Sequence, residues 1–280
     1  MSSPENQSTP NQTSDGAPEY AAPQPHEQPA AEEPARLGAV SRLTGTLFSP
    51  GETFADVNRK PTWIAPMIIA VATVLASTLF FSWRVHPDWD TIMRTQFKKQ
   101  AEKRNQQIPR EQLEQQVTVA KTIAKFSPII GAVFTPIVYV ILAGIFALGL
   151  MFIQAKTTFK KILSVVSWSC AATGIVATLV MMASLMIRDE EGLRSIDPTQ
   201  PSGIVPTNLA AFLASDTSAA IKSLAGSLDI FTIWLLILFS IGFAAIAGSR
   251  KITTGKTATI VFGFWVVFVI IKVGWSAMFG

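Results

Sequence analysis

Apolar residues along this chain are gathered into long blocks, and charged residues lie almost entirely between them. Five blocks are long enough, when wound as helices, to match the hydrocarbon core of a bilayer, which takes about 20 apolar residues. The blocks lie at residues 63–83, 127–154, 162–187, 230–249 and 257–279. The pattern predicts an all-α membrane protein with five transmembrane helices, in which the last two form a hairpin around a basic turn.

The first 35 residues follow a different pattern, rich in Pro, Gln, Ser and Glu and poor in apolar side chains. They contain seven prolines and six acidic residues, but no Lys or Arg. Such a segment buries too little apolar surface to offset the loss of chain entropy on folding. We therefore expect a disordered tail at residues 1–35 and a membrane domain at 36–280, with no secretory signal before the first span.

Residues 36–60 predict two short helices. Leu37, Val40 and Leu43 recur at helical spacing, and Ser49 followed by Pro50 is typical of the start of a second helix. These helices fit either of two placements. They lie on the membrane surface as interfacial amphipathic helices, or they fold as a soluble pair against the spans.

The loop at residues 84–125 holds nine basic and five acidic residues. Its weak helical spacing, and the clearer helix that opens at Pro109, favour a solvated helical hairpin leading into the second span. A basic surface for phosphate-bearing partners is the alternative. Interleaved aromatic residues are lacking, so we expect no nucleic-acid binding. His86, Asp88 and Asp90 share no helical face, so we expect no metal site. Pro136 predicts a kink in the second span.

Small residues recur along one face of two spans. In lipid, helices associate by close packing of small residues, so each stripe predicts a helix-helix interface for self-association or for a membrane-protein partner. The stripes are Ser167, Ala171, Gly174 and Thr178 in the third span, and Ser240, Ala244 and Gly248 in the fourth. Cys170, the one cysteine, is expected to be a buried apolar side chain.

Charged residues suggest one structural ion pair and an orientation. Asp229 opens the fourth span and Lys272 lies near the end of the fifth, so an antiparallel hairpin brings them to the same interface. Basic residues at the ends of the spans are more numerous on the amino-terminal side. The positive-inside rule therefore predicts a cytoplasmic amino terminus and an external carboxyl terminus.

Motifs of the common enzyme classes are missing from the sequence: there is no Gly-Xaa-Ser-Xaa-Gly elbow, His-Glu-Xaa-Xaa-His, phosphate loop or pair of intramembrane carboxylates. We therefore expect neither catalysis nor a cofactor. The leading hypothesis is a scaffold, adaptor or membrane-organising protein that acts through helix-helix contacts in the bilayer. The alternative is a small transporter or channel with Lys272 near its path.

Four segments of the chain resemble the Yip-one domain, the Ypt-interacting protein family, and most of all its bacterial members. They contain Pro50 and Phe54; Pro61 and Pro66; Thr158-Phe159-Lys160-Lys161; and Asp229, Phe231 and Trp234, with Gly242 downstream. The resemblance implies five spans and a cytoplasmic amino terminus, in a bacterial inner membrane. Eukaryotic relatives associate with Rab-type GTPases in vesicle traffic. Their Asp-Leu-Tyr-Gly-Pro motif has no counterpart here, so GTPase binding is not expected of this chain.

Overall fold

The computed structural model describes residues 37–103, 105–196, 203–214 and 216–279, and the tail expected to be disordered lies outside them. Within these ranges the regular structure is helical, with one isolated bridge between Asn208 and Asp229. The prediction of an all-α membrane protein is confirmed.

Four helices in the described part of the chain are long and apolar enough to cross a membrane. They are α3 (Ile64–Val85), α5 (Arg110–Phe152), α6 (Phe159–Met186) and α10 (Thr254–Phe279). The remaining predicted span is the shorter apolar helix α9 (Ile230–Ile246), with 17 residues. That length is at the lower limit for a transmembrane helix, about 17 residues. The helix ends before the predicted residue 249 because Gly248 adopts a left-handed backbone conformation, with φ +69°.

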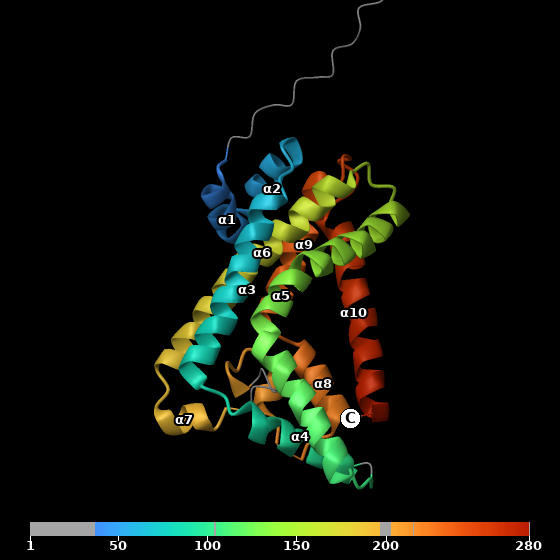
Figure 1. Ribbon diagram of the computed structural model, residues 1–280. Coiled ribbons are helices and arrows are strands. Elements are labelled where there is room, and N and C mark those ends of the chain that lie inside the picture. The colour runs from blue at the N-terminus through green and yellow to red at the C-terminus, as the bar shows by residue number, and fades with distance from the viewer. Residues whose placement is uncertain (1–36, 104, 197–202, 215, 280) are drawn as a thin grey trace, which may run out of the picture. The chain divides into compact units, whose positions relative to one another are not determined.

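Among the described residues, six shorter helical segments lie at the ends of the long helices. Figure 1 shows α1 and α2 at one end, and α4, α7, α8 and the carboxyl end of α10 at the other. This arrangement is the one expected for an odd number of crossings. The segments are α1 (Ala39–Phe48), α2 (Pro50–Arg59), α4 (Trp89–Lys103), α7 (Glu190–Arg194), the 3-10 helix η2 (Leu209–Phe212) and α8 (Ala219–Ser227).

Helices α1 and α2 pack against the spans, and α1 also leaves the apolar side chains of Val40 and Phe48 exposed. Phe54 and Val57 of α2 are fully buried in the main core, and α2 packs on α9 while α1 packs on α6. Helix α2 begins at Pro50, as predicted. The Ser49 side chain does not cap it; the Ser49 carbonyl instead accepts the Thr53 amide at 3.1 Å.

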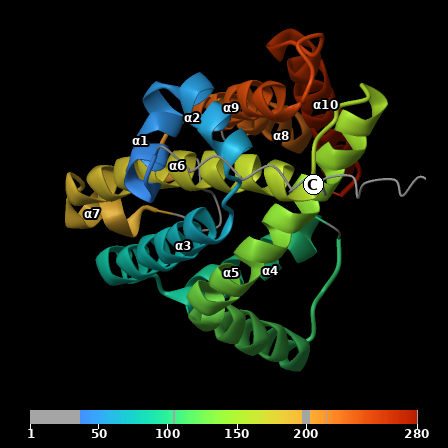
Figure 2. The ribbon, with the colours of Figure 1, turned by 90° about the horizontal axis from the view of Figure 1, so that it is seen from above.

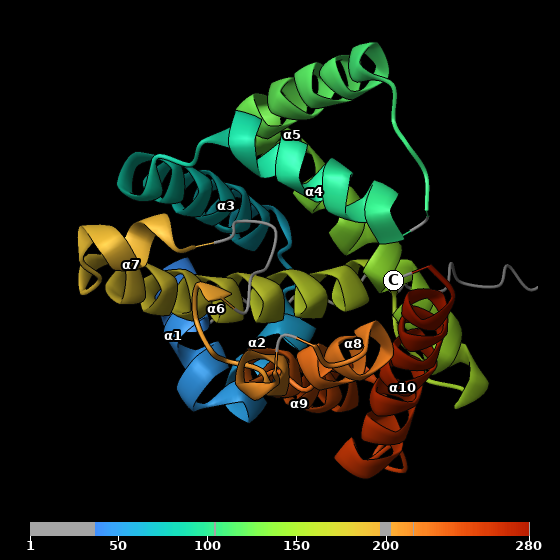
Figure 3. The same ribbon diagram turned by 90° about the horizontal axis from the view of Figure 1, so that it is seen from below.

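Helix α6 lies at the centre, with α3 on one side and α9 on the other (Figure 2 and Figure 3). Trp168 of α6 is the largest fully buried side chain of the described residues. Phe146 of α5 packs against two rings of α9, with centroids 5.1 Å from Phe239 and 4.9 Å from Phe243. Aromatic pairs at these separations add to the stability that their burial already supplies.

Helix α5 is far longer than the predicted second span. Its 43 residues extend about 64 Å at 1.5 Å per residue, roughly twice the thickness of the hydrocarbon core. Only the part from Phe126 onward is free of charged residues, so the first four turns lie outside the bilayer. The helix contains Pro128 and Pro136, and Figure 1 shows that it bends part way along, as prolines inside a helix cause.

Candidate functional site

Asp229 is the N-cap of α9. One carboxylate oxygen accepts the amides of Phe231 and Thr232, both at 3.0 Å, and the other accepts the Thr207 hydroxyl at 2.5 Å. A carboxylate at this position satisfies helix amides that have no partner within the helix. The same residue therefore starts α9 and ties the segment before η2 to it.

Lys272 does not pair with Asp229, contrary to the prediction. Its ammonium donates to the Ser227 hydroxyl at 3.0 Å and to the Ser223 carbonyl at 3.5 Å, both in the last turn of α8. Helix α8 packs on α10, which brings these acceptors to the lysine, while the Asp229 carboxylate is occupied by α9 and Thr207. A cation at a helix carboxyl end is also favoured by the helix dipole. Lys272 thus ties α8 to α10.

Two of the other motif residues, Phe54 and Gly242, lie at the junction of α2, α6 and α9. A Cβ atom built at Gly242 would lie 3.3 Å from the Phe54 ring and would overlap the Val165 side chain. The absence of a side chain at Gly242 therefore permits the three helices to approach closely. Pro66 is buried in the first turn of α3, Pro61 precedes that helix, and on α9 Phe231 is half-buried while Trp234 is exposed.

The small-residue stripes serve packing within the chain more than was predicted. Ser167, Ala171 and Ser240 are buried inside the described fold and present no surface to another molecule. The Ser240 carbonyl accepts the buried Thr257 hydroxyl of α10 at 2.7 Å. Gly174, Thr178 and Ala244 are half-buried, and Gly248 lies in the turn after α9. Cys170 is partly buried and packs against the main core.

A buried ion pair between α1 and α2 was not anticipated from the sequence. An Arg42 guanidinium nitrogen lies 2.8 Å from the Asp56 carboxylate, and the two side chains are 2% and 5% exposed. Arg42 also donates to the Thr62 hydroxyl at 2.6 Å, just before α3. The one signal in the sequence was an arginine on the apolar face of the first short helix, with an acid fourteen residues on.

The predicted helical hairpin of the first loop is confirmed as α4 packed on the first turns of α5. Arg94 binds Glu114 through two hydrogen bonds of 2.7 and 2.8 Å, and it also pairs with Asp90. Lys121 reaches Asp90 at 2.7 Å. These cations lower the pKa of Asp90 to about 2 and lower the pKa of Glu114. Asp88 accepts the Thr91 hydroxyl and two amides of α4, which lower its pKa.

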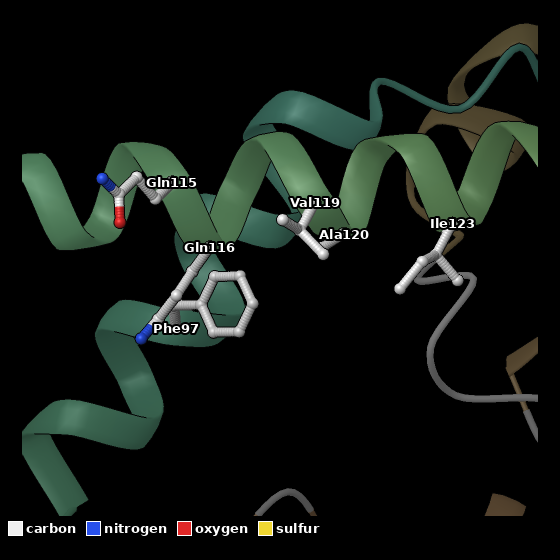
Figure 4. Close-up of a pocket in the computed structure, with 6 residues that line it drawn as sticks. All are labelled: Phe97, Gln115, Gln116, Val119, Ala120 and Ile123. Carbon is white, nitrogen blue, oxygen red and sulfur yellow. The ribbon is translucent and has the colours of Figure 1, made fainter.

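An open pocket of about 450 Å³ lies on one face of this hairpin (Figure 4). Phe97 of α4 lies beneath α5 there, next to Gln116. Val119 and Ile123 are 59% and 56% exposed. The lining residues are Phe97, Gln115, Gln116, Val119, Ala120 and Ile123. The exposed apolar side chains continue along α5 into its transmembrane part through Phe126 and Ile130.

The four long apolar helices and the shorter apolar helix of the described residues, with short helices at both ends, define a polytopic helical membrane protein. The chain belongs to the Yip1 domain family, which it matches over residues 44–276. It is also similar to the membrane protein YknW of Bacillus subtilis, with 27% identity over 228 residues that cover 81% of this chain and 87% of that protein. No solved structure gives a significant match.

Proposed function

We propose that the protein is a non-enzymatic membrane adaptor that binds a partner membrane protein along α5. The observation that carries this proposal is a row of four exposed apolar residues, here called the α5 stripe: Val119, Ile123, Phe126 and Ile130. Their spacing of four, three and four residues puts them on one face of the helix. Val119 and Ile123 precede Lys125, the last charged residue before the uncharged part of α5. Lipid tails therefore do not cover this half of the stripe.

The partner that fits this surface is another membrane protein that presents a helix. Because the stripe is continuous across the membrane boundary, a partner helix in the same bilayer contacts both of its halves. Gln115 and Gln116 flank the aqueous half, and their amides donate and accept hydrogen bonds. An apolar row with polar neighbours is the usual anatomy of a helix-binding surface.

Three charged residues of the membrane domain have partners inside the chain. Asp229 caps α9, and Arg42 pairs with Asp56 inside the α1–α2 unit. Lys272, the residue on which the transporter alternative depended, holds α8 against α10. These assignments support an adaptor that acts by contact.

A photo-crosslinking experiment in intact cells tests the proposal. Val119 of the full chain is replaced by p-benzoylphenylalanine, and the control is the same replacement at Val40 of α1, which is also exposed but lies at the other end of the spans. We expect a defined membrane-protein adduct from position 119 and none of that identity from position 40. Adding Ile123→Glu should abolish the adduct, because partner binding would bury the new carboxylate in an apolar contact and remove its water.

Three results would overturn the proposal. A product of twice the mass of the chain would show that a second copy covers the stripe. Lipid adducts alone would show that the stripe lies in the bilayer. An adduct that survives Ile123→Glu unchanged would show that contact at this face is incidental.

A further inference from the structure

The opposite face of α5 bounds a second pocket, of about 550 Å³. It lies where α3 ends, α4 begins and α5 approaches the membrane. Its walls are Ser82, Trp89, Thr118, Lys121, Thr122, Ala124 and Lys125. Ser82 is in the last turn of α3, and Lys125 immediately precedes the uncharged part of α5. The pocket is therefore at the level of the lipid headgroups.

Two lysines supply the charge of this pocket, and they differ in availability. The Lys121 ammonium already binds Asp90 at 2.7 Å. Lys125 is exposed and has no hydrogen-bond or ion-pair partner among the residues that the structure describes. The Thr118 and Thr122 hydroxyls donate to backbone carbonyls of α5 at 2.8 and 2.9 Å, so only their acceptor positions face the pocket. Lys125 is thus the hydrogen-bond donor of this pocket that lacks an acceptor, and Lys121 adds a second positive charge beside it.

We propose that this pocket binds the phosphate headgroup of an anionic phospholipid. The long lysine stem lies along the apolar wall while the ammonium reaches the phosphate, as is usual for lysines at the ends of spans. The half-buried Trp89 ring supplies the amphipathic surface that is favoured at the headgroup level. A lipid fits better than a free anion because Ala124 and Trp89 form an apolar wall continuous with the bilayer. This site is separate from the α5 stripe and does not depend on the adaptor proposal.

Native mass spectrometry of the full chain, released from vesicles of equal phosphatidylglycerol and phosphatidylcholine, tests the assignment. We expect wild-type protein to retain phosphatidylglycerol selectively. Lys125→Gln should reduce that retention about fivefold, the effect typical of one lysine near an anionic headgroup. The matched control is Lys99→Gln, which removes an exposed lysine of α4 that does not line the pocket, and it should retain lipid as wild type does.

A charge-preserving variant separates this site from simple loss of folding. Lys125→Arg keeps a cation at this position, so it should retain phosphatidylglycerol as wild type does. Equal retention by Lys125→Gln and wild type, an equal loss with Lys99→Gln, or the same loss with Lys125→Arg as with Lys125→Gln would overturn the proposal. Displacement of the lipid by millimolar inorganic phosphate would also overturn it, in favour of a soluble anion.

Discussion

Gly242 of α9 lies against Phe54 of α2, so that a methyl group on Gly242 would come within 3.3 Å of the phenylalanine ring. Phe54 is fully buried, although it belongs to a short polar helix that precedes the first span. This contact joins two motif residues that are almost two hundred positions apart in the sequence. It fixes α2, and through it α1, to the membrane helices.

Replacing Gly242 by alanine should destabilise the protein by about 1–3 kcal/mol, because the new methyl group overlaps Val165 and crowds Phe54. Thermal unfolding in mild detergent measures the effect. Gly174→Ala is the control, since that glycine of α6 has open space around it and alanine favours the helix. Equal melting temperatures for the two variants would contradict the close approach at Gly242.

Removing one partner of the buried ion pair should reduce the free energy of unfolding by more than Gly242→Ala does. Arg42→Ala leaves the Asp56 carboxylate buried without its guanidinium partner, and losses of about 3–5 kcal/mol are typical of such changes. The double variant Arg42→Met, Asp56→Leu, which replaces the pair by apolar residues, should recover most of that loss. Unfolding measurements on the three proteins decide the matter. A double variant no more stable than Arg42→Ala would mean that the charges do not act as a pair.

Asp229→Ala should loosen the start of α9 and destabilise the chain by about 0.5–2 kcal/mol, the usual effect of losing an N-cap. Asp229→Asn keeps an oxygen acceptor and should lose less. Hydrogen exchange at the Phe231 and Thr232 amides, which the carboxylate accepts, is the direct readout. Unchanged protection of these amides in Asp229→Ala would show that the cap contributes nothing.

The α4–α5 hairpin should loosen in acid. Arg94 and Lys121 lower the pKa of Asp90 from 3.8 to about 2, so its pairs stabilise the hairpin above about pH 4 and are lost as the pH falls toward 2. Spin labels at Lys98 and Gln112, in a Cys170→Ala background, should report a broader distance distribution between pH 4 and pH 2. In Asp90→Asn, the distance distribution between the labels should already be broad at pH 6 and should change less on acidification.

Single cysteines at Gln106 and Thr254, each introduced into a Cys170→Ala chain, test the orientation in the membrane. The basic residues near the span ends favour a cytoplasmic amino terminus, and the start of α10, which Thr254 forms, lies at the same end of the spans as α1 (Figure 1). A membrane-impermeant maleimide should therefore label Gln106 in intact cells and Thr254 only after permeabilisation. The reverse pattern would show that the basic first loop sets the orientation.

The apolar blocks, the start of α2 at Pro50 and the start of α9 at Asp229 could all be deduced from the sequence. These features are local: helix length follows from a run of neighbouring apolar residues, and a cap acts within one turn. The hairpin of α4 and α5 belongs to the same group, because its helices are adjacent along the chain.

Tertiary structure alone decided which residues meet across helices. In the folded chain Arg42 is buried with Asp56, and Lys272 binds the end of α8 instead of Asp229. Ser167 and Ser240 lie inside the fold. Tertiary structure also ended α9 early, where a side chain on Gly248 would collide with the Lys156 carbonyl. Each of these depends on the rotation and separation of helices far apart in the chain, which the packing of the whole domain determines and hydrophobic spacing does not encode.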